Sequence, residues 1–249
     1  MNNKIGLFDS GIGGLSVLRE LIQLLPHENY LFYEDSIHVP YGEKSDEELF
    51  DITSHIVDYL LGQNCKIIVI ACNTATTSCM SRLREKYPDT IFVGTVPAIK
   101  VAYDAHSSKT LILSTPYTMK SSRVRELVTE YQRDDQEIIN ISGENLATLI
   151  DFNEKDEIQN LLNRILSPYQ DSVDSVILGC THYSLIKQEI QSVLPNAKLL
   201  DGAYGVAKEV RHQLEEHNLL NPSSIQGNIE IVNSKDNSYV KRSFELLDL

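Results

Sequence analysis

Short apolar runs alternate with amphipathic stretches along the whole chain. The apolar runs have the character of buried strands, and they predict strands at Ile5–Phe8, Asn29–Tyr33, Ile67–Ile70, Ile91–Val93, Thr110–Leu113, Glu137–Ile141, Val176–Leu178 and Lys198–Leu200. The amphipathic stretches predict helices, most clearly at Gly13–Leu25, from the Ser45 cap to Gly62, from Cys72 to Arg84, at Glu157–Leu166 and at Ser184–Leu194. This alternation is typical of an α/β fold with mainly parallel sheets.

The two halves of the chain follow one plan. In residues 67–74 and 175–182 a strand run leads to a small residue, a cysteine and residues that can cap a helix. The two cysteines are 180 − 72 = 108 residues apart. Ser10 aligns with Thr115 at an offset of 105, and Gly94 aligns with Gly202 at an offset of 108. All α/β units look broadly alike, but corresponding strand ends at nearly one offset favour a duplication.

We therefore predict two similar α/β domains, each a mainly parallel sheet flanked by helices. We expect them to be related by pseudo-two-fold symmetry, with the active site between them. The first domain covers residues 1–95 and 205–249, and the second covers residues 96–204. The tail has no counterpart in the first half and predicts a helix through Val206, Val210 and Leu214, a strand at Ile229–Val232 and a last helix near Tyr239–Leu247. We expect this tail to pack on the first domain.

Composition narrows the classes of function. The 249 residues carry a net charge of −13, which opposes non-specific nucleic-acid binding. No apolar run approaches the ~18 residues of a membrane span, and the N-terminus enters a predicted strand without a signal-peptide core. Four cysteines without a CxxC spacing indicate free thiols rather than disulfides or zinc ligands. We expect a cytoplasmic protein that binds no metal, nucleic acid or membrane.

Polar and reactive residues follow five of the predicted strands. These are Asp9-Ser10, Asp35-Ser36, Cys72-Asn73-Thr74, Ser114-Thr115 and Cys180-Thr181-His182. Ligands of open α/β sheets bind outside the carboxyl ends of the strands. The pattern therefore predicts that these residues belong to one site.

Cys72 and Cys180 are the strongest candidates for chemistry. A thiol at the start of a helix lies among free backbone N–H groups, which stabilise its thiolate. A single cysteine after an apolar strand is more often a small buried hydrophobe, but two at equivalent positions favour catalysis. Cys65 and Cys79 lack this setting, and we interpret them as structural. Two thiols that face one substrate would suit a two-base proton transfer.

Three further motifs each have both a structural and a functional interpretation. The glycine-rich turn after Asp9 fits neither a dinucleotide fingerprint nor a P-loop, and Asp9 is either a helix N-cap or a carboxylate that steers a proton or an ammonium group. Pro40-Tyr41-Gly42 is a turn signal that could also offer N–H groups to a carboxylate. His182 is either a satisfied histidine or a catalytic group beside Cys180.

Taken together, these motifs resemble those of the glutamate racemase family. The matching segments are FDSGIGGLSVL from Phe8, PYG at Pro40–Gly42, ACNTAT at Ala71–Thr76, Gly94–Ala98, Thr115 with Thr118, and LGCTHY at Leu178–Tyr183. The resemblance implies a cofactor-independent enzyme that interconverts L- and D-glutamate and supplies D-glutamate for peptidoglycan. No sequence feature indicates a pyridoxal lysine.

The resemblance also implies roles for individual residues. Cys72 would deprotonate D-glutamate and Cys180 would deprotonate L-glutamate, with Asp9 near the first thiol and His182 near the second. The substrate-binding residues would be Asp9, Ser10, Pro40, Tyr41, Gly42, Asn73, Thr74, Thr115, Thr118, Thr181 and His182. Two positions depart from the family: Ser184 replaces a common proline, and Asp151 stands near a common glutamate. The roles of Asp35 and Asp151 are left open.

Other functions remain in competition with this interpretation. The nearest is an aspartate or broad-specificity racemase of the same superfamily, against which His182 and the Asp9–Gly14 opening argue. A thiol-redox protein would need cysteines that form a reversible disulfide. A carboxylate-binding protein would bind glutamate without exchanging its Cα proton. We also expect a homodimer, although the sequence does not indicate which surface pairs.

Overall fold

The computed structural model describes residues 3–236 and 238–247. The chain divides into two compact units. Unit 1 comprises Met1–Thr95 and Ala203–Leu249, and unit 2 comprises Val96–Gly202. The return to unit 1 falls two residues earlier than the sequence pattern suggests, at 203 instead of 205. No helix among the described residues is long and apolar enough to cross a membrane.

Unit 1 contains a five-stranded parallel sheet in the order β4-β3-β1-β2-β9. Its strands are β1 (Lys4–Asp9), β2 (Asn29–Glu34), β3 (Cys65–Ile70), β4 (Phe92–Gly94) and β9 (Ile229–Asn233). Strand β9 belongs to the tail and pairs with β2 from Tyr30↔Ile229 to Glu34↔Asn233. The expectation that the tail packs on the first half of the chain is therefore confirmed.

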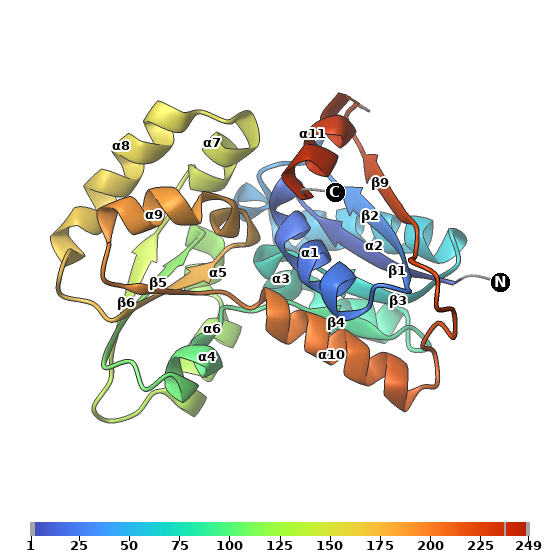
Figure 1. Ribbon diagram of the computed structural model, residues 1–249, viewed down its shortest axis with the longest axis horizontal. Coiled ribbons are helices and arrows are strands. Elements are labelled where there is room, and N and C mark those ends of the chain that lie inside the picture. Colours follow the sequence, from blue (N-terminus) through green and yellow to red (C-terminus); the bar gives the residue numbers. More distant parts are fainter. Residues whose placement is uncertain (1–2, 237, 248–249) are drawn as a thin grey trace. The chain divides into compact units, whose positions relative to one another are not determined.

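Helices flank this sheet. They are the 3-10 helices η1 (Ile12–Gly14) and η2 (Tyr41–Glu43), and α1 (Leu15–Leu24), α2 (Asp46–Gly62), α3 (Asn73–Lys86), α10 (Ala203–Glu216) and α11 (Ser238–Leu247). Helix α1 packs against α10 and α11 (Figure 1). Helices α2 and α3 share a core with alternate residues of β1 and β3, such as Phe8, Ile68 and Ile70. The predicted Ser45 cap is present, because the Ser45 hydroxyl accepts a hydrogen bond from Glu48 N at 3.2 Å.

Unit 2 contains a four-stranded parallel sheet in the order β6-β5-β7-β8. Its strands are β5 (Lys109–Ser114), β6 (Glu137–Ser142), β7 (Ser175–Gly179) and β8 (Lys198–Leu200). Its helices are α4 (Ile99–Asp104), α5 (Pro116–Lys120), α6 (Ser122–Tyr131), α7 (Leu146–Phe152), α8 (Lys155–Leu166), η3 (Ser167–Tyr169), η4 (Thr181–Ile186) and α9 (Lys187–Val193). Helix α8 packs between α7 and α9 (Figure 1). Ile112 and Ile177 form a core with residues of α4 and α6.

The two sheets share their topology. If β1, β2, β3 and β4 are matched to β5, β6, β7 and β8, the order β4-β3-β1-β2 in unit 1 becomes β8-β7-β5-β6 in unit 2, as observed. The registers agree too: Phe8 pairs with Ile70, and Leu113, at 8 + 105, pairs with Leu178, at 70 + 108. This agreement supports the duplication inferred from the sequence.

Two sequence expectations need correction. Ile68 pairs with Phe92 and Val176 pairs with Leu199, so β4 matches β8 at an offset of 199 − 92 = 107 rather than 108. The helix expected at Ser184–Leu194 is not continuous, because residues 181–186 form the 3-10 helix η4 and the α-helix begins only at Lys187. Short 3-10 segments are frequent at helix termini, and the apolar spacing does not distinguish them from the first turns of an α-helix.

Candidate active site

Three neighbouring strands bring reactive residues of unit 1 to one edge. Strand β1 lies between β2 and β3, so the residues that follow these strands emerge side by side. Asp35 N donates to Asp9 O at 2.9 Å, and Ala71 N donates to Phe8 O at 2.9 Å. The predicted cluster of strand-end residues therefore exists within this unit, with Cys72 directly after Ala71.

Asp9 is a fully buried carboxylate at the end of β1. Its Oδ1 accepts hydrogen bonds from Ser10 N at 2.7 Å and from the Ser10 hydroxyl at 3.3 Å. The N-cap interpretation of Asp9 is wrong, because Gly11 and Gly14 occupy the N-cap positions of η1 and α1. Gly14 is needed for space, since a Cβ there would lie 2.9 Å from the Asp9 Cβ and 2.7 Å from the Phe32 ring.

Cys72 is the N-cap residue of α3 and is 6% exposed. Cys72 thus stands at the positive end of a 14-residue helix, where the helix dipole favours an anion, although its side chain makes no capping hydrogen bond. Asn73 and Thr74 follow in the first turn and are both buried. The side-chain oxygen of Asn73 is buried without a hydrogen-bond partner. Because buried polar atoms are normally paired, this oxygen is a ready acceptor for a bound donor.

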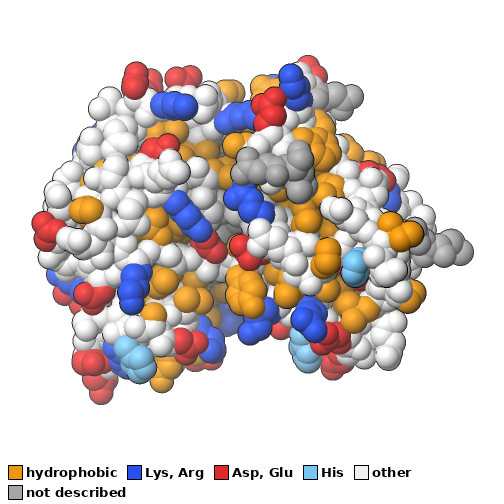
Figure 2. All heavy atoms as spheres, viewed as in Figure 1, with side chains coloured by type: hydrophobic (Ala, Val, Ile, Leu, Met, Phe, Trp, Pro, Cys, Tyr) orange, Lys and Arg blue, Asp and Glu red, His pale blue; other side chains and the backbone are white. Residues whose placement is uncertain are grey.

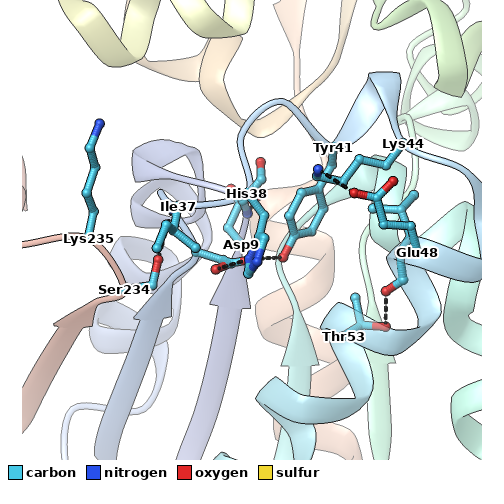
Figure 3. Close-up of polar contacts among 12 residues, drawn as sticks. Asp9, Ile37, His38, Tyr41, Lys44, Glu48, Thr53, Ser234 and Lys235 are labelled. Carbon is cyan, nitrogen blue, oxygen red and sulfur yellow. Dashed lines mark hydrogen bonds and ion pairs between the residues drawn. The ribbon is translucent and has the colours of Figure 1, made fainter.

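The loop after β2 carries a connected set of polar side chains. The Tyr41 hydroxyl donates to Asp35 Oδ2 at 2.7 Å, and His38 Nδ1 lies 2.8 Å from the same oxygen. The Tyr41 hydroxyl and the His38 ring point toward one another in Figure 3. Burial, and then the negative charge of Asp35, raises the pKa of Tyr41 well above its ordinary value, with smaller contributions from Cys72 and Asp9. Tyr41 therefore stays protonated as a donor close to the first cysteine.

Pro40 and Gly42 flank this tyrosine and are partly buried. The Val39–Pro40 peptide bond is cis, and Pro40 is the residue from which the short helix η2 begins. The predicted turn is therefore present, and it brings Tyr41 to the buried Asp35 rather than to solvent.

In unit 2, Cys180 belongs to a three-residue chain of contacts. Its sulfur lies 3.8 Å from His182 Nδ1, and His182 Nε2 lies 3.1 Å from Asp151 Oδ1. Burial alone would lower the pKa of His182, but the charge and hydrogen bond of Asp151, followed by Cys180, outweigh it and raise that pKa well above 6.5. His182 is thus held as a cation between a carboxylate and a thiol.

The remaining predicted residues of unit 2 lie at the starts of helices. Thr115 caps α5: its hydroxyl accepts from Thr118 N at 3.2 Å and donates to the Thr118 hydroxyl at 3.1 Å. Thr115 follows β5, and Thr181 follows Cys180 after β7, which is the neighbour of β5. Thr181 and Thr118 are buried. The polar strand ends of unit 2 therefore also gather at one edge of its sheet.

Two carboxylates make contacts that the sequence pattern does not predict. Asp151 contacts His182 across 31 residues, and Asp35 receives both Tyr41 and His38. The sequence does mark Asp35 as a candidate site residue, because it directly follows a predicted strand. Asp151 lies near the end of α7, and no local pattern indicates its partner.

The other two cysteines differ from these. Cys65 and Cys79 are buried in the core that surrounds α2 and α3. Burial raises the pKa of Cys65 to about 12 and raises that of Cys79 as well. Both thiols stay protonated, which fits the structural interpretation. None of the four cysteines forms a disulfide.

The surface gives no sign of a large polyanion site on the face seen in Figure 2, where Lys and Arg side chains are scattered among acidic and uncharged ones. Among residues 3–236 and 238–247, no group of three or more His, Cys, Asp or Glu side chains is arranged to hold a metal ion.

Comparisons with known proteins agree on one family. A model of the Asp/Glu/Hydantoin racemase family matches residues 5–210. A glutamate racemase of Clostridium acetobutylicum is 38% identical over 253 residues, covering 100% of this chain and 98% of the relative. A Bacillus anthracis glutamate racemase, RacE1, superimposes with a TM-score of 0.86 at 25% identity, over 98% of this chain and 92% of that one. An Escherichia coli glutamate racemase in complex with L-glutamate and the activator UDP-MurNAc-Ala superimposes with a TM-score of 0.82 at 30% identity, over 97% and 95%.

Proposed function

We propose a two-thiol mechanism for this chain, which belongs to the Asp/Glu/Hydantoin racemase family and is a glutamate racemase. In the proposal Cys72 and Cys180 exchange protons with opposite faces of the glutamate Cα. The observation that carries it is the presence of a strand-end cysteine at the same topological position in each unit. Inversion at carbon requires one group to remove the proton and another to supply one to the opposite face.

We assign Cys72 to the removal of the proton from D-glutamate. The α3 N-terminus favours its thiolate. Asp9 is the nearby carboxylate that would attract the substrate ammonium group. The unpartnered Asn73 oxygen supports this assignment, because it offers a second acceptor for the same group. The Tyr41 hydroxyl already donates its proton to Asp35, so the backbone N–H groups of Tyr41 and Gly42 would complete this half of the site as donors to a substrate carboxylate.

We assign Cys180 to the removal of the proton from L-glutamate. The short 3-10 helix η4 gives this thiol a weaker helix N-terminus than α3 gives Cys72. The protonated His182 lies 3.8 Å from this sulfur instead. Asp151 is a positioning residue in this scheme, because it acts on the thiol only through His182. The two bases are therefore activated by different means.

The substrate carboxylates would be held by hydroxyl and backbone donors. For unit 1 we propose Ser10, Thr74 and the Pro40–Gly42 turn, and for unit 2 we propose Thr115, Thr118 and Thr181. Such fixed donors stabilise charge that develops at the α-carboxylate when the Cα proton leaves. They also explain how an acidic protein can bind a dianion, since local donors outweigh distant screened charges.

We propose that the enzyme works in the cytoplasm and supplies D-glutamate for peptidoglycan. Four cysteines that form no disulfide are consistent with a reducing compartment. The homodimer expected from the sequence stays a prediction, which sedimentation of the purified chain would test.

The test is exchange of the Cα proton in D₂O. We expect L-glutamate and D-glutamate each to acquire deuterium at Cα and to racemise without added cofactor, as followed by proton NMR and polarimetry. Aspartate run in parallel should react far more slowly, and comparable rates would favour the broad-specificity alternative. Folded protein that binds glutamate without exchange would refute the two-thiol mechanism.

A further inference from the structure

The duplicated loops after β2 and β6 are anchored alike at one point. Asp35 N donates to Asp9 O at 2.9 Å in unit 1, and Gly143 N donates to Ser114 O at 2.8 Å in unit 2. These residues correspond, since 35 + 108 = 143 and 9 + 105 = 114. This backbone hydrogen bond, which anchors the loop to the end of the neighbouring strand, is therefore common to the two units.

A second anchor in unit 2 has no equivalent within the first half of the chain. The Tyr183 hydroxyl donates to Gly143 O at 3.0 Å, and a Cβ at Gly143 would lie 2.3 Å from that hydroxyl. The residue that corresponds to Tyr183 is Ala75, at 183 − 108. Alanine has no hydroxyl, so residue 75 cannot supply this second hydrogen bond to the loop after β2.

The C-terminal tail contacts this loop at two points. Ile37 N donates to the Ser234 hydroxyl at 3.0 Å, and the Asn233 amide donates to the Ser36 hydroxyl at 2.8 Å. Figure 3 shows Ser234 directly beside Ile37, on the loop that continues to His38 and Tyr41. The tail thus lies against the segment that leads from β2 to the proposed substrate-binding turn.

The tail also binds the end of β2 itself. Glu34 is fully buried, and its carboxylate accepts from the Ser243 hydroxyl at 2.6 Å and from the Asn233 amide at 2.9 Å. Its backbone oxygen accepts from Ser234 N at 2.9 Å. Hydrogen bonds to a carboxylate are stronger than those between neutral groups, so Glu34 ties both β9 and α11 to this strand end.

We propose that Asn233, Ser234 and Ser243 are positioning residues for the racemase reaction, as a brace that fixes the Pro40–Gly42 turn. The proposal rests on the proposed role of that turn in substrate binding. The tail brace holds the loop after β2 through Ser36 and Ile37, and the Tyr183 hydroxyl holds the corresponding loop after β6 through Gly143. None of the three residues needs to touch the substrate: they act by holding residues 35–38, and through Asp35 the Tyr41 hydroxyl, in place.

The proposal predicts a particular kinetic signature. We assign the turn to the side-chain carboxylate of glutamate, whose charge does not change in the transition state. The turn then contributes uniform binding, so loosening it raises KM with little effect on kcat. We expect Ser243→Ala and Ser234→Ala each to raise the KM for both enantiomers by about fivefold, because substrate binding must then order a turn that the brace orders in the parent enzyme, at a cost of about one typical hydrogen bond. Ser243→Thr keeps the hydroxyl and should restore a KM near that of the parent enzyme.

The matched control is Glu230→Gln on β9. It weakens the tail at the other end of the strand, where Lys4 binds Glu230 at 2.7 Å, without touching the loop. We expect this variant to keep its KM even if its melting temperature falls. Unchanged KM values in Ser234→Ala and Ser243→Ala, or an equal rise in Glu230→Gln, would overturn the brace. Ser234 is only half-buried, so its variant should fold. Parent enzyme that lacks Cα exchange would instead refute the proposed mechanism.

Discussion

Replacing Asp151 with asparagine should lower the pKa of His182 and slow racemisation in both directions. The Asp151 carboxylate lies 3.1 Å from an imidazole that is 2% exposed. At that separation, an effective dielectric constant of about 20 gives an attraction of about 5 kcal/mol. Burial of an ion costs several kcal/mol in the opposite direction. The carboxylate therefore decides whether the buried imidazole is protonated.

The effect should reach Cys180. Without the carboxylate, burial favours the neutral imidazole, and the sulfur loses a cation 3.8 Å away. Positioned acids and bases contribute about 10²–10⁴-fold to rates. Because the Cys180 thiol itself remains, we expect kcat/KM to fall by an amount near the lower end of that range, about 10²-fold. L- and D-glutamate have equal free energies in water. The loss in kcat/KM must therefore be the same from either enantiomer, although kcat and KM can change unequally.

Polarimetric initial rates from each enantiomer between pH 6 and 9 would measure the loss, and the imidazole proton resonances of His182 would report its pKa. Asp151→Glu keeps the charge and should retain most of the activity. Asp156→Asn makes the same chemical change at an exposed position of α8 and should leave the rates unaltered. An Asp151→Asn enzyme with parent kcat/KM, or with an unchanged His182 pKa, would refute the reasoning.

Two further predictions concern the thiols and the histidine. Cys72→Ala and Cys180→Ala should each reduce the racemisation rate measured by polarimetry by about 10³-fold or more. The control Cys65→Ala, in the buried core, should stay active. Substantial racemisation by Cys72→Ala or Cys180→Ala would contradict the two-thiol assignment. Because Asp151 raises the folded-state pKa of His182 against the opposing effect of burial, their pair stabilises the fold fully below pH ~6.5, the unfolded pKa. That stabilisation is lost as the pH rises through the folded pKa. The gap in urea midpoint between the parent and Asp151→Asn should therefore be widest near pH 6, and a gap that widens at alkaline pH would show that the sign is wrong.

The sequence predicted those features that depend on local pattern. Apolar runs such as Ile67–Ile70 lie within observed strands, and the predicted bounds err by one or two residues because strand ends are polar. The clustering of Asp9, Asp35 and Cys72 followed from the parallel topology, which places the carboxyl ends of neighbouring strands together. These inferences need no knowledge of distant contacts.

Features that depend on contacts far apart in sequence were not predictable. The partner of His182 lies 31 residues away on another helix, and the partner of Glu34 lies 209 residues away. The 3-10 character of η4 was also missed, because its apolar spacing resembles that of an α-helix. Tertiary packing decides such details, and one sequence carries no record of it.

The contribution of β9 to unit 1 has a consequence for the order of synthesis. Unit 2 is one continuous stretch of chain, whereas unit 1 needs residues 229–233 to pair with β2. Domains generally fold as units while the chain emerges from the ribosome. Unit 2 can therefore complete its sheet before residues 229–247 are synthesised, whereas unit 1 must wait for them to receive its edge strand and α11. The unit that contains Cys72 thus matures last, so a prematurely terminated chain would hold Cys180 in a finished domain and Cys72 in an unfinished one.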